Sequence, residues 1–218
     1  MYEGTGLYGQ SELRQVSPID GRVIQSQAIS PKHFGEGIAH FKDKFGAERI
    51  IQITWKERLG FVYDATSFEV IREFTFDSMT GEGWGITYDA TSDEFVVSDG
   101  SHWLFFWDAD TLEEKRRVEV KLSRINERGT RERVEVRFLN ELEYDRGHIL
   151  ANVWYQDVLL MINPQTGDVK KVYDFSGLYN DRIESADCFN GIALSDIEGQ
   201  LFVTGKNWPH MYKIRLLS

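Results

Sequence analysis

Two short motifs alternate along this chain, and their recurrence limits the possible folds more than any other feature. The first is a turn rich in Asp, Asn, Pro and Gly between two short apolar stretches, and it occurs at residues 18–21, 64–66, 108–111 and 163–167. The second is a segment of small or polar residues that leads into an apolar stretch, at residues 34–38, 83–86, 139–142 and 189–192. Self-similarity with a period of a few tens of residues is typical of propellers and solenoids.

The stretches between the motifs have the composition of β-strands. Short apolar runs are broken by Asp, Gly, Asn and Thr, which is typical of a β-meander, and no sustained helical period is present. The runs that we expect to form strands are residues 49–55, 60–63, 94–98, 103–107, 148–154, 158–162, 200–204 and 211–216. The sequence therefore predicts an all-β protein.

The alternation of the two motifs predicts the blades of a β-propeller. The inner strand of a blade faces the central channel, where crowded backbones favour glycine, so we assign the small and polar segments to inner strands. The turns are then the hairpins between the two outer strands of each blade. Four turns and a last blade ending at residues 211–216 give five blades, whereas only four inner strands are present. We therefore predict one domain, residues 1–218, folded as a five-bladed β-propeller whose first blade lacks its innermost N-terminal strand.

The charge and the distribution of apolar residues exclude several partners. The net charge of −10 at pH 7 would repel the phosphates of nucleic acid. Basic residues in the 115–133 stretch are interleaved with glutamates, which favours a solvated hairpin over a nucleic-acid patch. No apolar run reaches transmembrane length and the first residues show no signal-peptide pattern, so we expect no membrane partner. The compartment, an exported one included, and the oligomeric state are left open.

The cysteine and histidine patterns argue against a metal or a cofactor. Cys188 is the single cysteine, so neither a disulfide within the chain nor a thiolate zinc cluster is possible. The five histidines show no His-x-His or His-Glu-x-x-His spacing; they are His33, His40, His102, His148 and His210. The sequence also has no Gly-x-Ser-x-Gly elbow and no phosphate-binding loop. We therefore predict no metal site and no cofactor for the reaction, and we leave open whether a structural cation sits in the channel.

Eight strings in the sequence match one protein family in the same order, and they are spread over nearly the whole chain, from residue 3 to residue 209. They are residues 3–11 (EGTGLYGQS), 34–37 (FGEG), 53–55 (ITW), 81–85 (GEGWG), 98–101 (SDGS), 139–144 (LNELEY), 151–154 (ANVW) and 203–209 (VTGKNWP). On these strings the chain resembles the plant and bacterial glutaminyl-peptide cyclotransferases, or glutaminyl cyclases. The resemblance implies a metal-independent enzyme, an aminoacyltransferase that converts the N-terminal glutamine of a peptide or protein to pyroglutamate with release of ammonia.

The resemblance implies three catalytic residues. Glu36 matches the family's catalytic acid. The attacking α-amine must be neutral, and because a free α-amine has a pKa of about 7.7–8.0, one carboxylate can take its proton and return it to the leaving nitrogen. Asn140 and Lys206 match the family's polar contacts, and both are donors suited to the negative charge that develops on the amide oxygen. A loop carboxylate, a turn asparagine and a solvated lysine are the structural alternatives for these three.

Four further residues are predicted to bind the substrate. Trp55, Trp84 and Trp154 match the family's aromatic cage, which would exclude water and offer indole N–H groups to the glutamine. Asn190 lies at an inner-strand position, with turn capping as the alternative for it and for Asp99. The other tryptophans are expected in the core. Three more acidic residues lie near the predicted channel mouth, and one of them is expected to meet the peptide amine: Glu82, Glu141 and Glu143.

One departure from the family keeps rival functions open. Family members begin with an additional strand that carries a Phe-Thr-Gln-Gly-like motif, and this sequence shows no counterpart. The first rival is therefore a catalytically impaired propeller of the same family that acts as a peptide or protein binding module. The second is a hydrolase of another propeller family with paired carboxylates or a channel-bound calcium, which the acid-rich inner strands suggest.

Overall fold

The computed structural model describes residues 1–216, so the last two residues of the predicted domain lie outside the described range. Residues 1–216 form twenty β-strands and no helix, which confirms the all-β prediction. Within this range, no helix is long and apolar enough to cross a membrane. The chain divides into two compact units, of which the described residues are 1–99 with 105–116, and 100–104 with 117–216.

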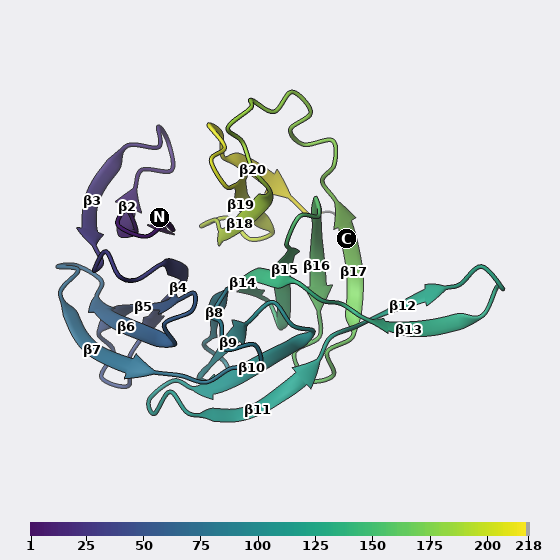
Figure 1. Cartoon of the computed structure of the whole chain (residues 1–218), viewed down its shortest axis with the longest axis horizontal. Helices are drawn as coiled ribbons and strands as arrows, with labels where there is room; N and C mark the ends of the chain where they lie inside the picture. Colours follow the sequence, from purple (N-terminus) through teal and green to yellow (C-terminus); the bar gives the residue numbers. More distant parts are fainter. Residues whose placement is uncertain (217–218) are drawn as a thin grey trace. The chain divides into compact units, whose positions relative to one another are not determined.

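The first unit consists of three antiparallel sheets in which each strand pairs with the next along the chain (Figure 1). The first sheet has three strands: β1 (Tyr2–Gly4), β2 (Glu12–Val16) and β3 (Val23–Ala28). The second has four: β4 (Gly35–Lys42), β5 (Glu48–Thr54), β6 (Leu59–Asp64) and β7 (Val70–Thr75). The third has four as well, although the start of β10 and the end of β11 belong to the second unit: β8 (Ile86–Asp89), β9 (Glu94–Ser98), β10 (Trp103–Asp108) and β11 (Glu114–Glu119).

The second unit consists of two sheets and a separate hairpin. One sheet has four strands: β14 (Leu139–Asp145), β15 (His148–Val153), β16 (Val158–Ile162) and β17 (Val169–Asp174). The other has three: β18 (Phe189–Leu194), β19 (Gln200–Gly205) and β20 (Tyr212–Arg215). The hairpin joins β12 (Lys121–Ile125) to β13 (Arg131–Glu135), and Figure 1 shows it extending away from β17. The hairpin predicted in the basic stretch is thereby confirmed.

The four predicted turns share one geometry. In each, the N–H of the fifth residue donates to the carbonyl of the first at 2.9 Å, and the pairs are Gly21 to Ser17, Phe68 to Asp64, Leu112 to Asp108 and Gly167 to Asn163. The first side chain caps the turn: Asp108 Oδ1 accepts the N–H groups of Asp110 at 3.1 Å and Thr111 at 2.9 Å. The fifth residue has a positive φ, of 70°, 61°, 65° and 71° in the same order. Each turn connects the last two strands of its sheet, as predicted.

Each unit has its own apolar core between the sheets. In the first unit one cluster of buried side chains comprises Leu13, Ile50, Phe61, Tyr63, Ala65 and Phe68. A matching cluster in the second unit comprises Leu150, Leu159, Phe189, Ile192, Leu201 and Val203. A fully buried Leu, Ile or Phe stabilises a fold by about 1.5–3 kcal/mol, so these clusters fix how the strands of each unit pack. Trp107 is 2% exposed, which confirms its predicted place in the core.

The first and last sheets have three strands instead of four. The turn at residues 17–21 joins β2 to β3, so the first sheet corresponds to the second, third and outermost strands of a blade, and β1 is an edge strand. Within the described residues this sheet contains no innermost strand, as predicted. In the last sheet β18 carries the inner-strand motif, so its three strands start from the inner edge. The meander sheets thus give five blades.

Candidate active site

All seven predicted site residues occupy one of two equivalent positions of the repeat. The first position lies at the start of the inner-strand motif and holds Glu36, Trp84, Asn140 and Asn190. The second is the residue directly after the second strand of a four-stranded blade or its equivalent, and it holds Trp55 after β5, Trp154 after β15 and Lys206 after β19. The fold therefore gives side chains of different chemistry the same backbone setting.

A change of strand register marks the first position in three of the four inner strands. Along β4 the register slips by one residue between Gly35 and Ile38, so the inner strand carries one extra residue next to Glu36. The same slip occurs in β14 around Asn140 and in β18 around Asn190. Such β-bulges bend the strand and re-aim a side chain, and they are common next to active sites.

The glycines on both sides of Glu36 are required by close backbone contacts. A Cβ atom on Gly37 would lie 2.8 Å from the carbonyl oxygen of Trp84, and one on Gly35 would lie 2.9 Å from the carbonyl oxygen of Thr5. Neither contact leaves room for a side chain. The Gly-Glu-Gly string therefore has a structural reason: it lets β4 pass between two neighbouring backbones while presenting a single carboxylate.

Backbone hydrogen bonds tie together the three segments of the first unit that carry site residues. Trp55 N–H donates to the carbonyl of Phe34 at 3.0 Å, and Gly83 N–H donates to the carbonyl of Trp55 at 2.8 Å. Gly37 N–H donates to the carbonyl of Trp84, also at 2.8 Å. The structure thus brings the segments of the predicted acid and of two cage tryptophans together within one compact unit.

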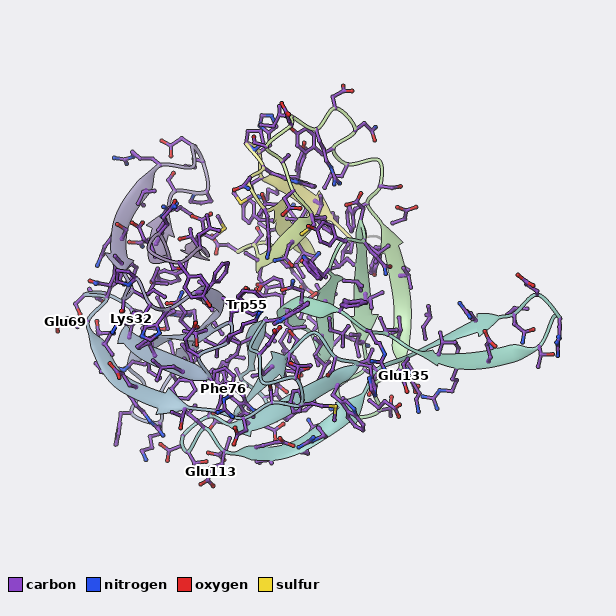
Figure 2. The ribbon with its side chains drawn as sticks, viewed as in Figure 1. Lys32, Trp55, Glu69, Phe76, Glu113 and Glu135 are labelled. Atoms are coloured by element: carbon purple, nitrogen blue, oxygen red, sulfur yellow. The ribbon has the colours of Figure 1, made fainter. Side chains whose placement is uncertain are left out.

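Glu82 holds both of these tryptophans through one oxygen atom. Trp55 Nε1 donates to Glu82 Oε2 at 2.9 Å, and Trp84 Nε1 donates to the same oxygen at 2.8 Å (Figure 2 labels Trp55). Lys56 Nζ lies 3.8 Å from Glu82 Oε1 and 3.7 Å from the centroid of the Trp55 ring. The two indole N–H groups, expected to face the glutamine, are therefore engaged by a carboxylate that fixes the orientation of both rings.

The loop that carries Glu82 is itself held by Asp99. Thr80 N–H donates to Asp99 Oδ2 at 3.0 Å, and the Thr80 hydroxyl donates to the Asp99 carbonyl at 2.8 Å. The Ser78 hydroxyl donates to the Glu82 carbonyl at 2.7 Å. Asp99 is fully buried, and these contacts agree with its capping alternative. Of the three acidic residues predicted near the channel mouth, Glu82 thus orients the Trp55 and Trp84 rings, a role that the sequence did not reveal.

The second unit repeats the backbone contact of the first around Trp154. Trp154 N–H donates to the carbonyl of Phe138 at 2.9 Å, as Trp55 does to Phe34. Asn140 is 4% exposed. Lys206 N–H donates to the carbonyl of Cys188 at 2.9 Å. Within residues 1–216 no carboxylate forms an ion pair with the Lys206 ammonium.

Two buried amides of the second unit have unmet hydrogen-bonding capacity. Asn152 is fully buried on β15, and its Oδ1 accepts the N–H of Gly191 at 2.9 Å. Its Nδ2, and the Oδ1 of Asn190, are buried without a hydrogen-bond partner among the described residues. Because buried polar atoms are nearly always paired, these atoms are candidates for contacts with a ligand or water. The sequence analysis does not single out Asn152, whose signal there is an amide next to apolar residues of β15.

A cavity of about 270 Å³ opens beside this part of the second unit. Its lining residues are Tyr155, Asp157, Arg182, Ala186, Asp187 and Cys188. Arg182 Nη2 is held by Asp157 Oδ1 at 2.7 Å. Burial raises the pKa of the Cys188 thiol, so at neutral pH it stays protonated and is not a nucleophile. The cavity therefore offers polar contacts but no thiolate nucleophile.

Comparisons with known sequences agree with these motifs. Residues 1–216 match the model of the family described as glutamine cyclotransferase. A glutaminyl-peptide cyclotransferase from Arabidopsis thaliana is 33% identical over 220 residues, which cover 99% of this chain. The chain spans 63% of the length of that relative.

Solved structures share the fold. The crystal structure of Myxococcus xanthus glutaminyl cyclase has a TM-score of 0.80 and 32% identity, with 98% of this chain and 84% of that chain covered. A protein of unknown function from Bacteroides caccae shares the fold alone, with a TM-score of 0.58 and 11% identity over 98% of this chain and 88% of that one. The five meander sheets and the likeness to the Myxococcus enzyme confirm the five-bladed β-propeller class. Because the family model matches from the first to the last described residue, the chain belongs to the glutamine cyclotransferase family.

Proposed function

We propose that this protein catalyses the cyclisation of N-terminal glutamine in peptides or proteins to pyroglutamate, with release of ammonia. The observation that carries the proposal is the setting of Glu36. It lies at a β-bulge between two glycines that cannot be replaced, in the unit that also holds the Trp55 and Trp84 rings fixed on Glu82. The chain also belongs to a family whose relatives from Arabidopsis and Myxococcus are named for this reaction.

In the proposed reaction Glu36 moves one proton. The neutral α-amine attacks the side-chain amide carbon, a C–N bond forms and closes the five-membered lactam, and the bond to the amide nitrogen breaks. The Glu36 carboxylate accepts the proton that the attacking nitrogen loses and gives it to the departing nitrogen, which leaves as ammonia. No proton is gained or lost overall, so one positioned carboxylate is sufficient. General acid–base catalysis of this kind contributes typically about 10²- to 10⁴-fold.

The other residues are assigned to orientation and charge stabilisation. Ring closure is intramolecular, and well-oriented intramolecular reactions reach effective molarities of about 10⁵–10⁸ M, so holding the chain end in a bent pose supplies much of the rate. The rings of Trp55, Trp84 and Trp154 would exclude water from that pose. For Asn140 and Lys206 we propose the role of donors to the amide oxygen as it gains negative charge.

Asn190 is assigned to substrate binding, because its buried Oδ1 has no partner among the described residues and can accept a peptide N–H. Asn152 Nδ2 provides a complementary buried donor in the same unit. None of these proposed roles requires a metal ion, so we propose that the reaction is metal-independent. We also propose that the whole chain acts as the single domain predicted from the sequence.

Ammonia release from a peptide that begins with glutamine tests the proposed function. We expect turnover above the spontaneous rate that persists after dialysis against a strong chelator. The matched control peptide has the same sequence with an acetylated α-amine, which has no nucleophile and should release no ammonia. If the free peptide also shows only the spontaneous rate but still binds, the chain is a binding module of this family and not an enzyme.

A further inference from the structure

We propose that His102, Glu119 and Glu135 form a Zn²⁺ site at the base of the β12–β13 hairpin. One potential ligand atom from each residue lies within 4.8 Å of the others. The residues come from three segments of the second unit: the loop before β10, the end of β11 and the end of β13. Figure 2 labels Glu135 at the base of the hairpin. The histidine spacing in the sequence did not predict this site, because its ligands are far apart along the chain.

The imidazole of His102 is held next to both carboxylates without a hydrogen bond. Its Nε2 lies 3.8 Å from Glu119 Oε1, and its Nδ1 lies 3.6 Å from Glu135 Oε2. The side chain is 13% exposed, and Nδ1 is buried with no hydrogen-bond partner in residues 1–216. An unpaired buried ring nitrogen is costly, because it loses its bond to water without replacement. A cation bound at this nitrogen removes that cost.

The two carboxylates are already oriented by basic residues. Lys121 Nζ contacts Glu119 Oε2 at 2.5 Å, which leaves Oε1 directed at His102. Arg137 Nη2 contacts Glu135 Oε2, the oxygen nearest to His102 Nδ1, at 3.0 Å. Partners of this kind are typical of metal sites, where they fix the orientation of a ligating carboxylate. The arrangement therefore has both potential ligands and the groups that position them.

The donor set favours zinc over the hard cations. Ca²⁺ and Mg²⁺ prefer oxygen ligands throughout, whereas Zn²⁺ commonly takes imidazole nitrogen together with carboxylate oxygen. Zn²⁺ with three protein ligands also accepts water as the fourth, which suits a site whose outermost ligand, Glu135, is exposed. Zinc–ligand bonds are about 2.0–2.2 Å, so the three side chains must close on the ion by small rotations. Bound zinc would then fasten the hairpin to the loop before β10.

The site is separate from the residues assigned to catalysis in the same unit. Asn140, Trp154 and Lys206 contribute no atom to the His102 cluster. Zinc binding is therefore measured independently of ammonia release, and neither result depends on the other.

Calorimetric titration of the full chain with ZnCl₂ tests the proposal. After dialysis against a chelator, we expect one Zn²⁺ to bind per chain near neutral pH, with no comparable binding of Mg²⁺ or Ca²⁺. Zinc should also raise the Tm, because an ion that binds only the folded state stabilises it.

Three variants complete the test. Glu135→Gln changes an exposed side chain and should fold, yet weaken zinc binding by about tenfold or more. His102→Gln should abolish binding. The matched control is His40→Gln, because His40 Nε2 lies 2.8 Å from Glu48 without a second carboxylate in a ligand cluster, and this variant should bind zinc like the parent chain. Absence of zinc binding to the parent chain, or unchanged binding to both Glu135→Gln and His102→Gln, would overturn the proposal.

Discussion

The inner-strand bulges and the outer hairpin turns both recur around the repeat, but they differ in what they keep constant. The outer turns keep backbone and chemistry: Ser17, Asp64, Asp108 and Asn163 each cap their own turn with a side-chain oxygen. The starts of the inner-strand motifs keep the same backbone setting, but the side chain there differs: it is Glu36, Trp84, Asn140 or Asn190. Side chains are therefore constrained by the backbone at the outer edge and are free to diversify at the inner one, where the proposed chemistry lies.

The outer turns also show how the repeat tolerates strain. Their fifth residue has a positive φ, which glycine adopts freely at Gly21 and Gly167. Phe68 and Leu112 adopt the same conformation, at a cost of about 1–2 kcal/mol for a residue with a Cβ. Both are buried, at 1% and 8% exposure, and burial of a large apolar side chain offsets a cost of that size. The turn geometry is thus kept either by glycine or by a side chain that packs into the core.

The largest expected effect comes from removing the acid of an inner bulge. Glu36→Gln keeps the shape of the side chain but cannot carry the proton, so we expect ammonia release to fall by about 10²- to 10⁴-fold with the Tm nearly unchanged. The matched control is Glu69→Gln, an exposed carboxylate that follows an outer turn. Equal rates for the two variants would show that Glu36 has no part in the mechanism. The inner-strand positions would then not differ from the outer turns in function.

The second prediction sets two outer turns against each other. Phe68→Ala removes a buried ring and leaves the positive φ, so we expect a loss of about 3–5 kcal/mol in the free energy of unfolding. Gly21→Ala adds a Cβ at the same turn position, where no atom lies within 4 Å, and should cost only about 1 kcal/mol. Chemical denaturation measures both. Similar losses of unfolding free energy in the two variants would mean that burial of the side chain does not offset the positive φ at Phe68.

The third prediction concerns the support of the inner positions. Glu82→Ala leaves the indole N–H groups of Trp55 and Trp84 without their acceptor, so both rings should lose their fixed orientation. Loss of one such hydrogen bond costs about 1–3 kcal/mol, and we expect kcat/KM to fall by about tenfold, with a shift in tryptophan fluorescence. Glu82→Gln keeps an acceptor oxygen and serves as the control. If both variants retain full activity, the ring orientation has no influence on turnover.

The smallest effect at neutral pH is expected at an outer turn. Backbone N–H groups of Thr111 and Asp110 lower the pKa of Asp108 below its ordinary 3.8. A lowered folded-state pKa contributes stability above that ordinary value, and the contribution is lost as the pH falls through the folded pKa. Asp108→Asn reproduces the cap found at Asn163 without a charge. Its Tm should match the parent chain at pH 7 and decline less steeply below pH 3.8; parallel Tm curves would contradict the assignment.

The sequence was sufficient to predict the features that repeat. The turns and inner-strand motifs recur in chain order, so they were sufficient to predict the blades and the three-stranded first sheet, whereas Glu36 and Lys206 were assigned from the family resemblance. Contacts that do not repeat were not predictable in this way. The contacts of the shared Glu82 oxygen depend on a loop held by Asp99, and the unpartnered Nδ2 of Asn152 depends on the burial of this side chain next to Gly191. Such contacts join segments distant in sequence and appear only when the chain is folded.

Because Trp55 and Trp84 end on a single oxygen, they form one energetic unit instead of two. In a double-mutant cycle, replacing each tryptophan by phenylalanine should give losses that are not additive, since removal of either donor changes the hydrogen bond that the other makes. An altered ring at one position is then best tolerated together with an altered ring at the other. Under the proposed function, selection for a different peptide end would therefore have to change the two tryptophans as a pair.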